Sequence, residues 1–153
     1  MDTPSTLKRP GRHATAAVLA AAGFIGFGAL GIAHAAPAVH TAQGIEYVSG
    51  GIGSGEAREM QAMEAQWPAT LEFAVQDHGK AEFAADVHVR VLDNKGQAVM
   101  DGVVAHGPFM LARLTPGNYK VEATLDGKQL TRTLDVKAGT HARATFVWPA
   151  GTA

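Results

Sequence analysis

A stretch between residues 114 and 136 combines alternating side chains with tight-turn signals, and it constrains the fold more than any other part of the chain. Apolar and polar residues alternate over 119–125, which is the two-residue period of a β-strand with one buried face. A Pro-Gly pair at 116–117 precedes this segment and an Asp-Gly pair at 126–127 follows it. Both pairs favour tight turns, so the pattern predicts strands joined by short connections.

The same period recurs between residues 69 and 148, with a turn signal between successive segments. The expected strands are residues 69–76, 86–92, 97–103, 109–114, 119–126, 129–136 and 141–148. Strands spaced about eight to twelve residues apart are typical of a β-sandwich. We therefore predict an all-β domain over 68–149, a seven-stranded sandwich without a parallel sheet, and a short tail at 150–153.

A single helix is expected before the strands. Residues 56–67 are rich in good helix formers, and Met60, Met63 and Trp67 recur at helical spacing. Pro68 cannot continue a helix and therefore marks its end. The apolar stripe of this short N-terminal helix is expected to cover one face of a sheet.

The segment that precedes the helix has a different composition. Residues 36–55 contain a short leader followed by four glycines between positions 50 and 55. Glycine tolerates backbone angles that other residues avoid, so this segment is expected to be a leader and glycine-rich loop.

The first 35 residues have the organisation of a secretory signal peptide. Three basic residues precede position 13, an uncharged apolar run covers 14–32, and small residues occupy positions 33 and 35. This order predicts cleavage after Ala35 and a periplasmic product. The apolar run is also long enough to cross a membrane, so the alternative is an inner-membrane anchor with the domain facing the periplasm.

Charge and cysteine content exclude several classes of function. Removing residues 1–35 would leave 10 basic and 13 acidic residues, and this acidic balance argues against binding nucleic acid or anionic lipid. After cleavage no stable membrane insertion is expected. The chain has no cysteine, so no disulfide supports the fold in an oxidising compartment.

The turn before residue 119 also carries a family resemblance. The run Leu114–Val121, with Gly127, Val136 and Gly139, resembles the Pro-Gly-x-Tyr signature of carboxypeptidase regulatory-like domains, which are prealbumin-like or transthyretin-like sandwiches. Residues 85–96 are similar to the usual first half of those domains, in which a strand and a turn precede the next strand. The resemblance implies a prealbumin-like fold and a non-catalytic accessory or binding module without a cofactor.

A narrower resemblance involves residues outside that signature. The run Tyr47–Gly53, the acidic helix and residues 107–109 look like those of small exported proteobacterial proteins that carry this domain. The role of those proteins is not established. The two resemblances together cover most of residues 45–148 and imply an uncharacterised envelope protein.

Histidines are the only candidate metal ligands that suggest a different function. The expected mature chain keeps five, namely His40, His78, His88, His106 and His141. None belongs to a His-x-His or His-Glu-x-x-His motif, so dispersed surface histidines are the simpler interpretation. The alternative is a periplasmic metal-binding protein that uses His88 and His106 from neighbouring strands. No nucleophile–base pair is apparent, and we expect no enzyme activity.

A partner surface is predicted near the glycine-rich segment. Tyr47 and Ile52 are apolar anchors beside it, and His106 and Phe109 flank a rigid Gly-Pro pair. We expect these four residues to form one surface for an envelope protein or a saccharide. The competing interpretation is that the segment covers a sheet edge and so prevents strand-to-strand aggregation.

Overall fold

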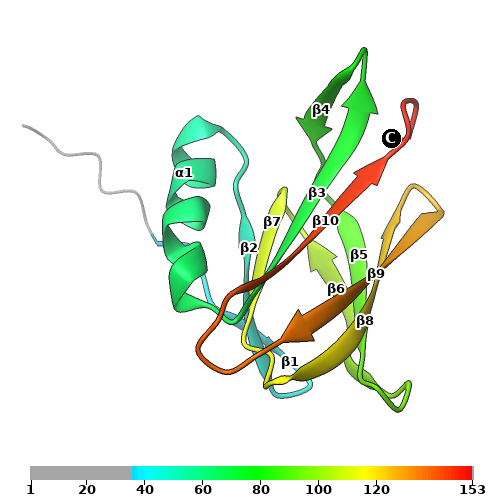
Figure 1. The fold of residues 1–153 in the computed structure, drawn as a ribbon. Coiled ribbons are helices and arrows are strands. Elements are labelled where there is room, and N and C mark those ends of the chain that lie inside the picture. The colour runs from blue at the N-terminus through cyan, green and yellow to red at the C-terminus, as the bar shows by residue number, and fades with distance from the viewer. Residues whose placement is uncertain (1–35, 153) are drawn as a thin grey trace, which may run out of the picture. The chain divides into compact units, whose positions relative to one another are not determined.

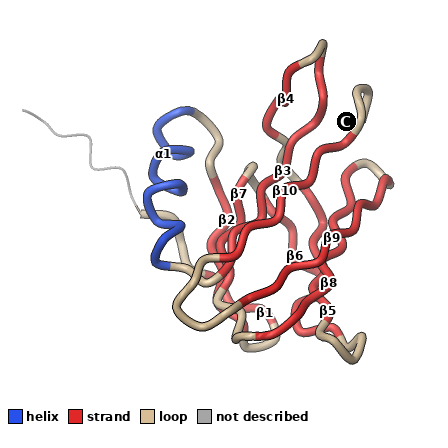
Figure 2. Tube along the Cα trace, in the orientation of Figure 1, coloured by secondary structure: helices blue, strands red, loops and turns tan. Residues whose placement is uncertain are grey.

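The computed structural model describes residues 36–152, so the predicted signal peptide at 1–35 lies outside the described residues. The described chain is mostly β, with two sheets and one short helix (Figures 1 and 2). The strands are β1 (His40–Ala42), β2 (Ile45–Gly50), β3 (Ala69–Asp77), β4 (Lys80–Phe83), β5 (Val87–Leu92), β6 (Ala98–Ala105), β7 (Phe109–Ala112), β8 (Gly117–Leu125), β9 (Lys128–Val136) and β10 (Ala142–Trp148). The helix α1 (Ser54–Met63) continues into a 3₁₀ turn, η1 (Glu64–Gln66).

The strands form a six-stranded and a four-stranded sheet. Sheet A has the order β1-β2-β7-β3-β10, and β4 pairs with the second half of β3. Sheet B has the order β6-β5-β8-β9. Every pair is antiparallel except β3–β10, which is parallel and aligns Ala69 with Ala142. The prediction that no strands would be parallel is therefore wrong at this one pair.

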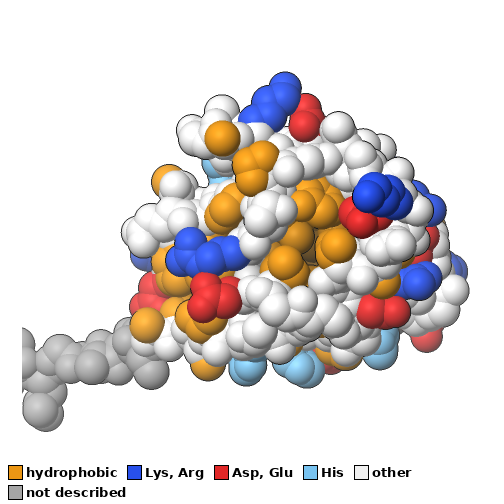
Figure 3. Space-filling model, turned by 90° about the horizontal axis from the view of Figure 1, so that it is seen from below, with side chains coloured by type: hydrophobic (Ala, Val, Ile, Leu, Met, Phe, Trp, Pro, Cys, Tyr) orange, Lys and Arg blue, Asp and Glu red, His pale blue; other side chains and the backbone are white. Residues whose placement is uncertain are grey.

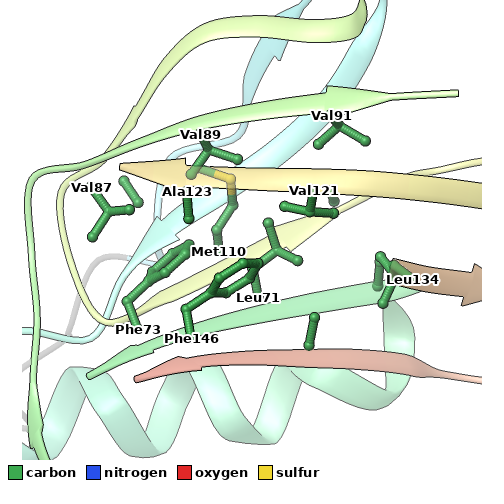
Figure 4. Close-up of a cluster of buried hydrophobic side chains, with 14 of the residues drawn as sticks. Leu71, Phe73, Val87, Val89, Val91, Met110, Val121, Ala123, Leu134 and Phe146 are labelled. Carbon is green, nitrogen blue, oxygen red and sulfur yellow. The ribbon is translucent and has the colours of Figure 1, made fainter. Parts of the chain in front are cut away.

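The two sheets enclose a common hydrophobic core. Val87, Val89 and Val91 alternate with exposed residues on β5 and face Phe73 of β3 and Phe146 of β10 (Figure 4). Burying one face of each strand is what the two-residue period in the sequence requires. The core thus confirms the period-two interpretation of these segments.

A second, smaller core lies on the outer face of sheet A, beneath α1. Its buried members are Val48, Ala57, Met60, Trp67, Phe109 and Leu111. Ala57 and Met60 of the helix pack in this cluster with residues of β2 and β7, as expected for its apolar stripe. The helix lies beside β2 (Figure 1). Met63 packs only partly against this cluster. The helix therefore shields a sheet face that would otherwise be exposed.

Each predicted strand is present, but three further strands bring the number among the described residues to ten. These are β1, β2 and β4. The β2 strand falls in the predicted glycine-rich loop, and it pairs with β7 in sheet A. A Cβ on Gly50 would collide with the side chain of Glu56, and a Cβ on Gly107 would collide with the backbone of Gly50. These two glycines therefore permit close packing around a regular strand.

Tyr119 occupies the corner that the Pro-Gly turn predicted. Its side chain is 8% exposed, and its hydroxyl donates a hydrogen bond of 2.7 Å to the Thr115 carbonyl oxygen. The Thr115 hydroxyl lies 3.1 Å from the Tyr119 hydroxyl oxygen and can donate to it. A buried phenol satisfied in this way ties the start of β8 to the preceding loop.

Side chains join the two sheets along their edges. On one side, the Trp148 indole N–H donates to the Lys128 carbonyl oxygen at 2.7 Å, which links β10 to β9. On the other, the Gln43 side-chain oxygen accepts the Asp101 N–H at 3.0 Å, which links the β1–β2 turn to β6. These bonds satisfy main-chain groups at sheet edges that would otherwise be open to strand pairing.

Candidate binding site

The structure does not assemble the four residues of the predicted partner surface. Phe109 is fully buried beneath α1, with its ring 5.3 Å from that of Phe83. Tyr47 is half-buried on the opposite face of sheet A, where it packs against the main core and stacks on His40. Phe109 and Tyr47 therefore cannot present one contact surface.

Ile52 and His106 are accessible, but each has a different setting. Ile52 is 65% exposed and stands in the loop before α1. The backbone N–H of His106 donates to the Ser49 hydroxyl oxygen at 2.9 Å, and its imidazole lies 3.3 Å from Asp86. The first of these bonds fixes the β6–β7 loop against β2.

Neither histidine of the predicted pair belongs to a cluster of three metal-ligating side chains among the described residues. His88 is exposed on the outer face of sheet B, opposite Val104 of β6 and Thr124 of β8. Within residues 36–152, no three His, Asp or Glu side chains gather closely enough to hold a metal ion. Dispersed surface histidines account for this placement.

A recess at one end of the sheets has the features of a ligand site. It has a volume of about 460 Å³ and is bounded by η1, the β7–β8 loop and the β9–β10 loop. Its floor contains the nearly buried side chains of Trp67, Leu114 and Val136, and Pro116 and Ala138 add exposed apolar surface. Figure 3 views this end of the molecule and shows hydrophobic side chains surrounded by charged ones. We call this feature the end recess.

Two cations stand at the rim of the end recess. The Arg113 guanidinium lies 4.4 Å from the centre of the Trp67 ring, and its Nε is 2.9 Å from a carboxylate oxygen of Glu46. Lys137 pairs with Asp135 at 3.1 Å, and this pair is largely exposed. Among the described residues that line the recess, none is acidic. The recess wall therefore has two cations, each with a carboxylate partner outside the lining.

His141 supplies a hydrogen-bonding group of defined chemistry to the wall. Its Nδ1 is 2.8 Å from the Trp67 carbonyl oxygen. A carbonyl oxygen only accepts, so Nδ1 must carry the proton of this bond. In the neutral ring the other nitrogen, Nε2, is then an acceptor. The recess thus combines cations, one imidazole acceptor and an apolar floor, which suits binding of a small group.

Strand pairing between distant segments brings these residues together. Pro68 ends the helical segment, and its carbonyl oxygen accepts the Ala142 N–H at 2.9 Å. The parallel β3–β10 pairing then places His141 beside Trp67. Arg113 follows the last residue of β7 and enters the same end of the sheet. The sequence alone predicts neither Arg113 nor His141 as a binding residue. The one available signal is that loops at one end of a sandwich commonly meet.

Comparison with known proteins adds no assignment. No protein-family model matches the sequence, and no curated protein matches it. Within the part of the chain that the structure describes, no helix is long and apolar enough to cross a membrane. The geometry of the end recess is therefore the main basis for a functional assignment.

Proposed function

We propose that this chain is a non-catalytic binding or accessory module of the cell envelope, and that its partner, a protein or a saccharide, enters the end recess. The recess itself carries this proposal, because an apolar floor with a few polar rim groups is the usual form of a small-ligand site. Its only hydroxyl-bearing lining residue, Thr140, donates to the Lys137 carbonyl oxygen at 3.2 Å. That hydroxyl is directed to the backbone, which favours binding over nucleophilic chemistry.

The proposal also includes the type of fold. Two facing sheets and the Tyr119 corner after Pro116-Gly117 support a prealbumin-like β-sandwich of the carboxypeptidase regulatory-like kind. Such domains act beside other proteins, so an accessory role fits a chain of this size. The three added strands and α1 would then be elaborations of the sheet A side.

Export is expected to produce a mature protein that begins at Ala36. The basic start, the apolar run and the small residues at 33 and 35 form the cleavage pattern. Mass spectrometry of the protein purified from a periplasmic fraction measures this directly. An intact Met1 in the membrane fraction would instead support the inner-membrane anchor.

Filling the end recess is expected to abolish partner binding without unfolding the protein. Ala138 is exposed and lines the recess, so Ala138→Trp adds a large ring there with little effect on the core. Ala81→Trp is the matched control, because Ala81 is exposed on β4, outside the recess lining. Pull-down from an envelope extract, repeated with the purified partner, should succeed with wild type and Ala81→Trp and fail with Ala138→Trp.

Two results would contradict the proposal. Partner capture that is equal in wild type and Ala138→Trp would place the binding surface elsewhere. Sub-micromolar binding of copper, nickel or zinc in calorimetry, lost in His88→Ala or His106→Ala, would instead favour the metal-binding alternative. Thermal unfolding of each variant establishes that the fold is intact.

A further inference from the structure

We infer that the end recess binds the carboxyl-terminal end of a peptide chain whose last side chain is apolar. This inference rests on the proposed function and names the ligand class for the same site. A peptide terminus of this kind offers three groups together: a carboxylate, an amide N–H and an apolar side chain. The described recess wall has a complement for each of them.

The carboxylate matches the two rim cations. The closest contact of Glu46 is with Nε of Arg113, and a guanidinium has further N–H donors on its two Nη atoms. Lys137 is held only by an exposed pair with Asp135, and exposed pairs are weak enough for a ligand to replace. Cations that meet a carboxylate above an apolar floor form stronger hydrogen bonds than they do in open water.

The amide N–H and the side chain match the rest of the wall. His141 donates from Nδ1 to Trp67, which leaves Nε2 as an acceptor for a ligand N–H. Pro68, Pro116 and Ala138 line the recess and are at least partly exposed, so they provide apolar surface against which an apolar side chain can be buried. The recess volume of about 460 Å³ lies within the range of small-ligand sites.

A saccharide fits the same wall less well. Stacking of a sugar ring needs an open aromatic face, and Trp67 is the only aromatic residue among the described residues of the lining. Its side chain is 5% exposed, and the Arg113 guanidinium covers one face of the ring. The accessible apolar lining consists of alanine and proline side chains, and this favours a peptide over a saccharide.

Fluorescence anisotropy with a defined peptide tests the inference. The ligand is a fluorescein-labelled hexapeptide, Gly-Ser-Gly-Ser-Ala-Leu, with a free carboxyl terminus, and the same peptide with an amidated terminus is the comparison. Amidation removes the charge-assisted bonds and is expected to weaken binding at least about tenfold. A uronate oligosaccharide is added as an unlabelled competitor and is expected not to displace the peptide.

Substitutions of the two rim cations test whether they cause the difference in affinity between the free-acid and amidated peptides. Lys137→Gln and Arg113→Gln are each expected to weaken the free-acid peptide by about tenfold and to leave the amidated peptide nearly unchanged. Lys80→Gln is the matched control, because Lys80 is equally a surface lysine but lies on β4, outside the recess lining. Lys137 is highly exposed, so its replacement keeps the test valid even if Arg113→Gln disturbs packing on Trp67.

Equal affinity for the free-acid and amidated peptides would overturn the inference, as would displacement of the peptide by the uronate. The experiments can also show whether only this inference is wrong or whether the proposed function is wrong as well. If Ala138→Trp abolishes capture of an envelope partner but removal of that partner's last residue changes nothing, the module binds through the recess and the peptide-terminus inference is wrong. If Ala138→Trp has no effect on any partner, the proposed function itself fails.

Discussion

Replacing Trp148 by Ala is expected to lower the free energy of unfolding by about 3–5 kcal/mol. The side chain is fully buried, and its ring lies 6.2 Å from that of Phe146 and 6.4 Å from that of Phe73. Removing it leaves a cavity between the sheets, and the Lys128 carbonyl oxygen loses the indole N–H at 2.7 Å. Urea unfolding followed by circular dichroism measures the loss.

Trp148→Phe separates the two contributions. It keeps most of the apolar volume but removes the hydrogen-bond donor, so a smaller loss of about 1–3 kcal/mol is expected. An alanine variant that loses no more than the phenylalanine variant would show that the bond to Lys128, and not the buried ring, is the main contribution. A loss below about 1 kcal/mol in both would contradict the core as described.

Phe109→Ala is expected to destabilise the protein by about 3–5 kcal/mol, whereas Ile52→Ala should change stability by less than about 0.5 kcal/mol. Phe109 is fully buried beneath α1, and its ring meets that of Phe83 edge-on at 66°. Ile52 is exposed, so its removal leaves no cavity. Thermal and urea unfolding of the two variants make a direct comparison.

Comparing Phe109→Ala with Ile52→Ala shows whether each residue packs in the interior or contacts a partner. If Phe109→Ala kept wild-type stability but no longer bound the partner, Phe109 would belong to a binding surface and not to the core. If Ile52→Ala destabilised the protein as much as Phe109→Ala, the loop before α1 would have to be part of the packed interior. Both results would contradict the burial observed here.

The strands of the central core were predictable from local sequence. On β5, Val87, Val89 and Val91 alternate with exposed residues, and that pattern requires only one buried face. Tyr119 was predictable for a similar reason, because its hydroxyl bonds to Thr115, only four residues away. Features that depend on near neighbours in the chain were therefore correctly assigned.

The additional strands lacked such a signal. All four residues of β4 are exposed, so no alternation between buried and exposed positions marks it. Near β2, glycine is required at position 107, because a Cβ there would collide with the backbone of Gly50, and this contact forms only when the β6–β7 loop packs against β2. Glycine in a sequence indicates a loop and close packing equally well, and here packing is the reason.

The end recess depends on contacts between distant segments. Trp67 and His141 meet only because β3 and β10 pair in parallel, and no local pattern specifies which strands become neighbours. The predicted surface failed for a related reason. Tyr47 and Phe109 lie on adjacent strands but face opposite sides of sheet A, and their facing depends on strand register.

The parallel β3–β10 pair also has a consequence for the order in which the chain folds. The strand that begins the central domain, β3, has as its neighbour the strand that ends it, and residues as far apart as Thr70 and Arg143 must meet. Closing so long a loop is entropically costly and raises the contact order, which slows folding. Sheet A therefore cannot be completed until the C-terminal strand has emerged from the ribosome.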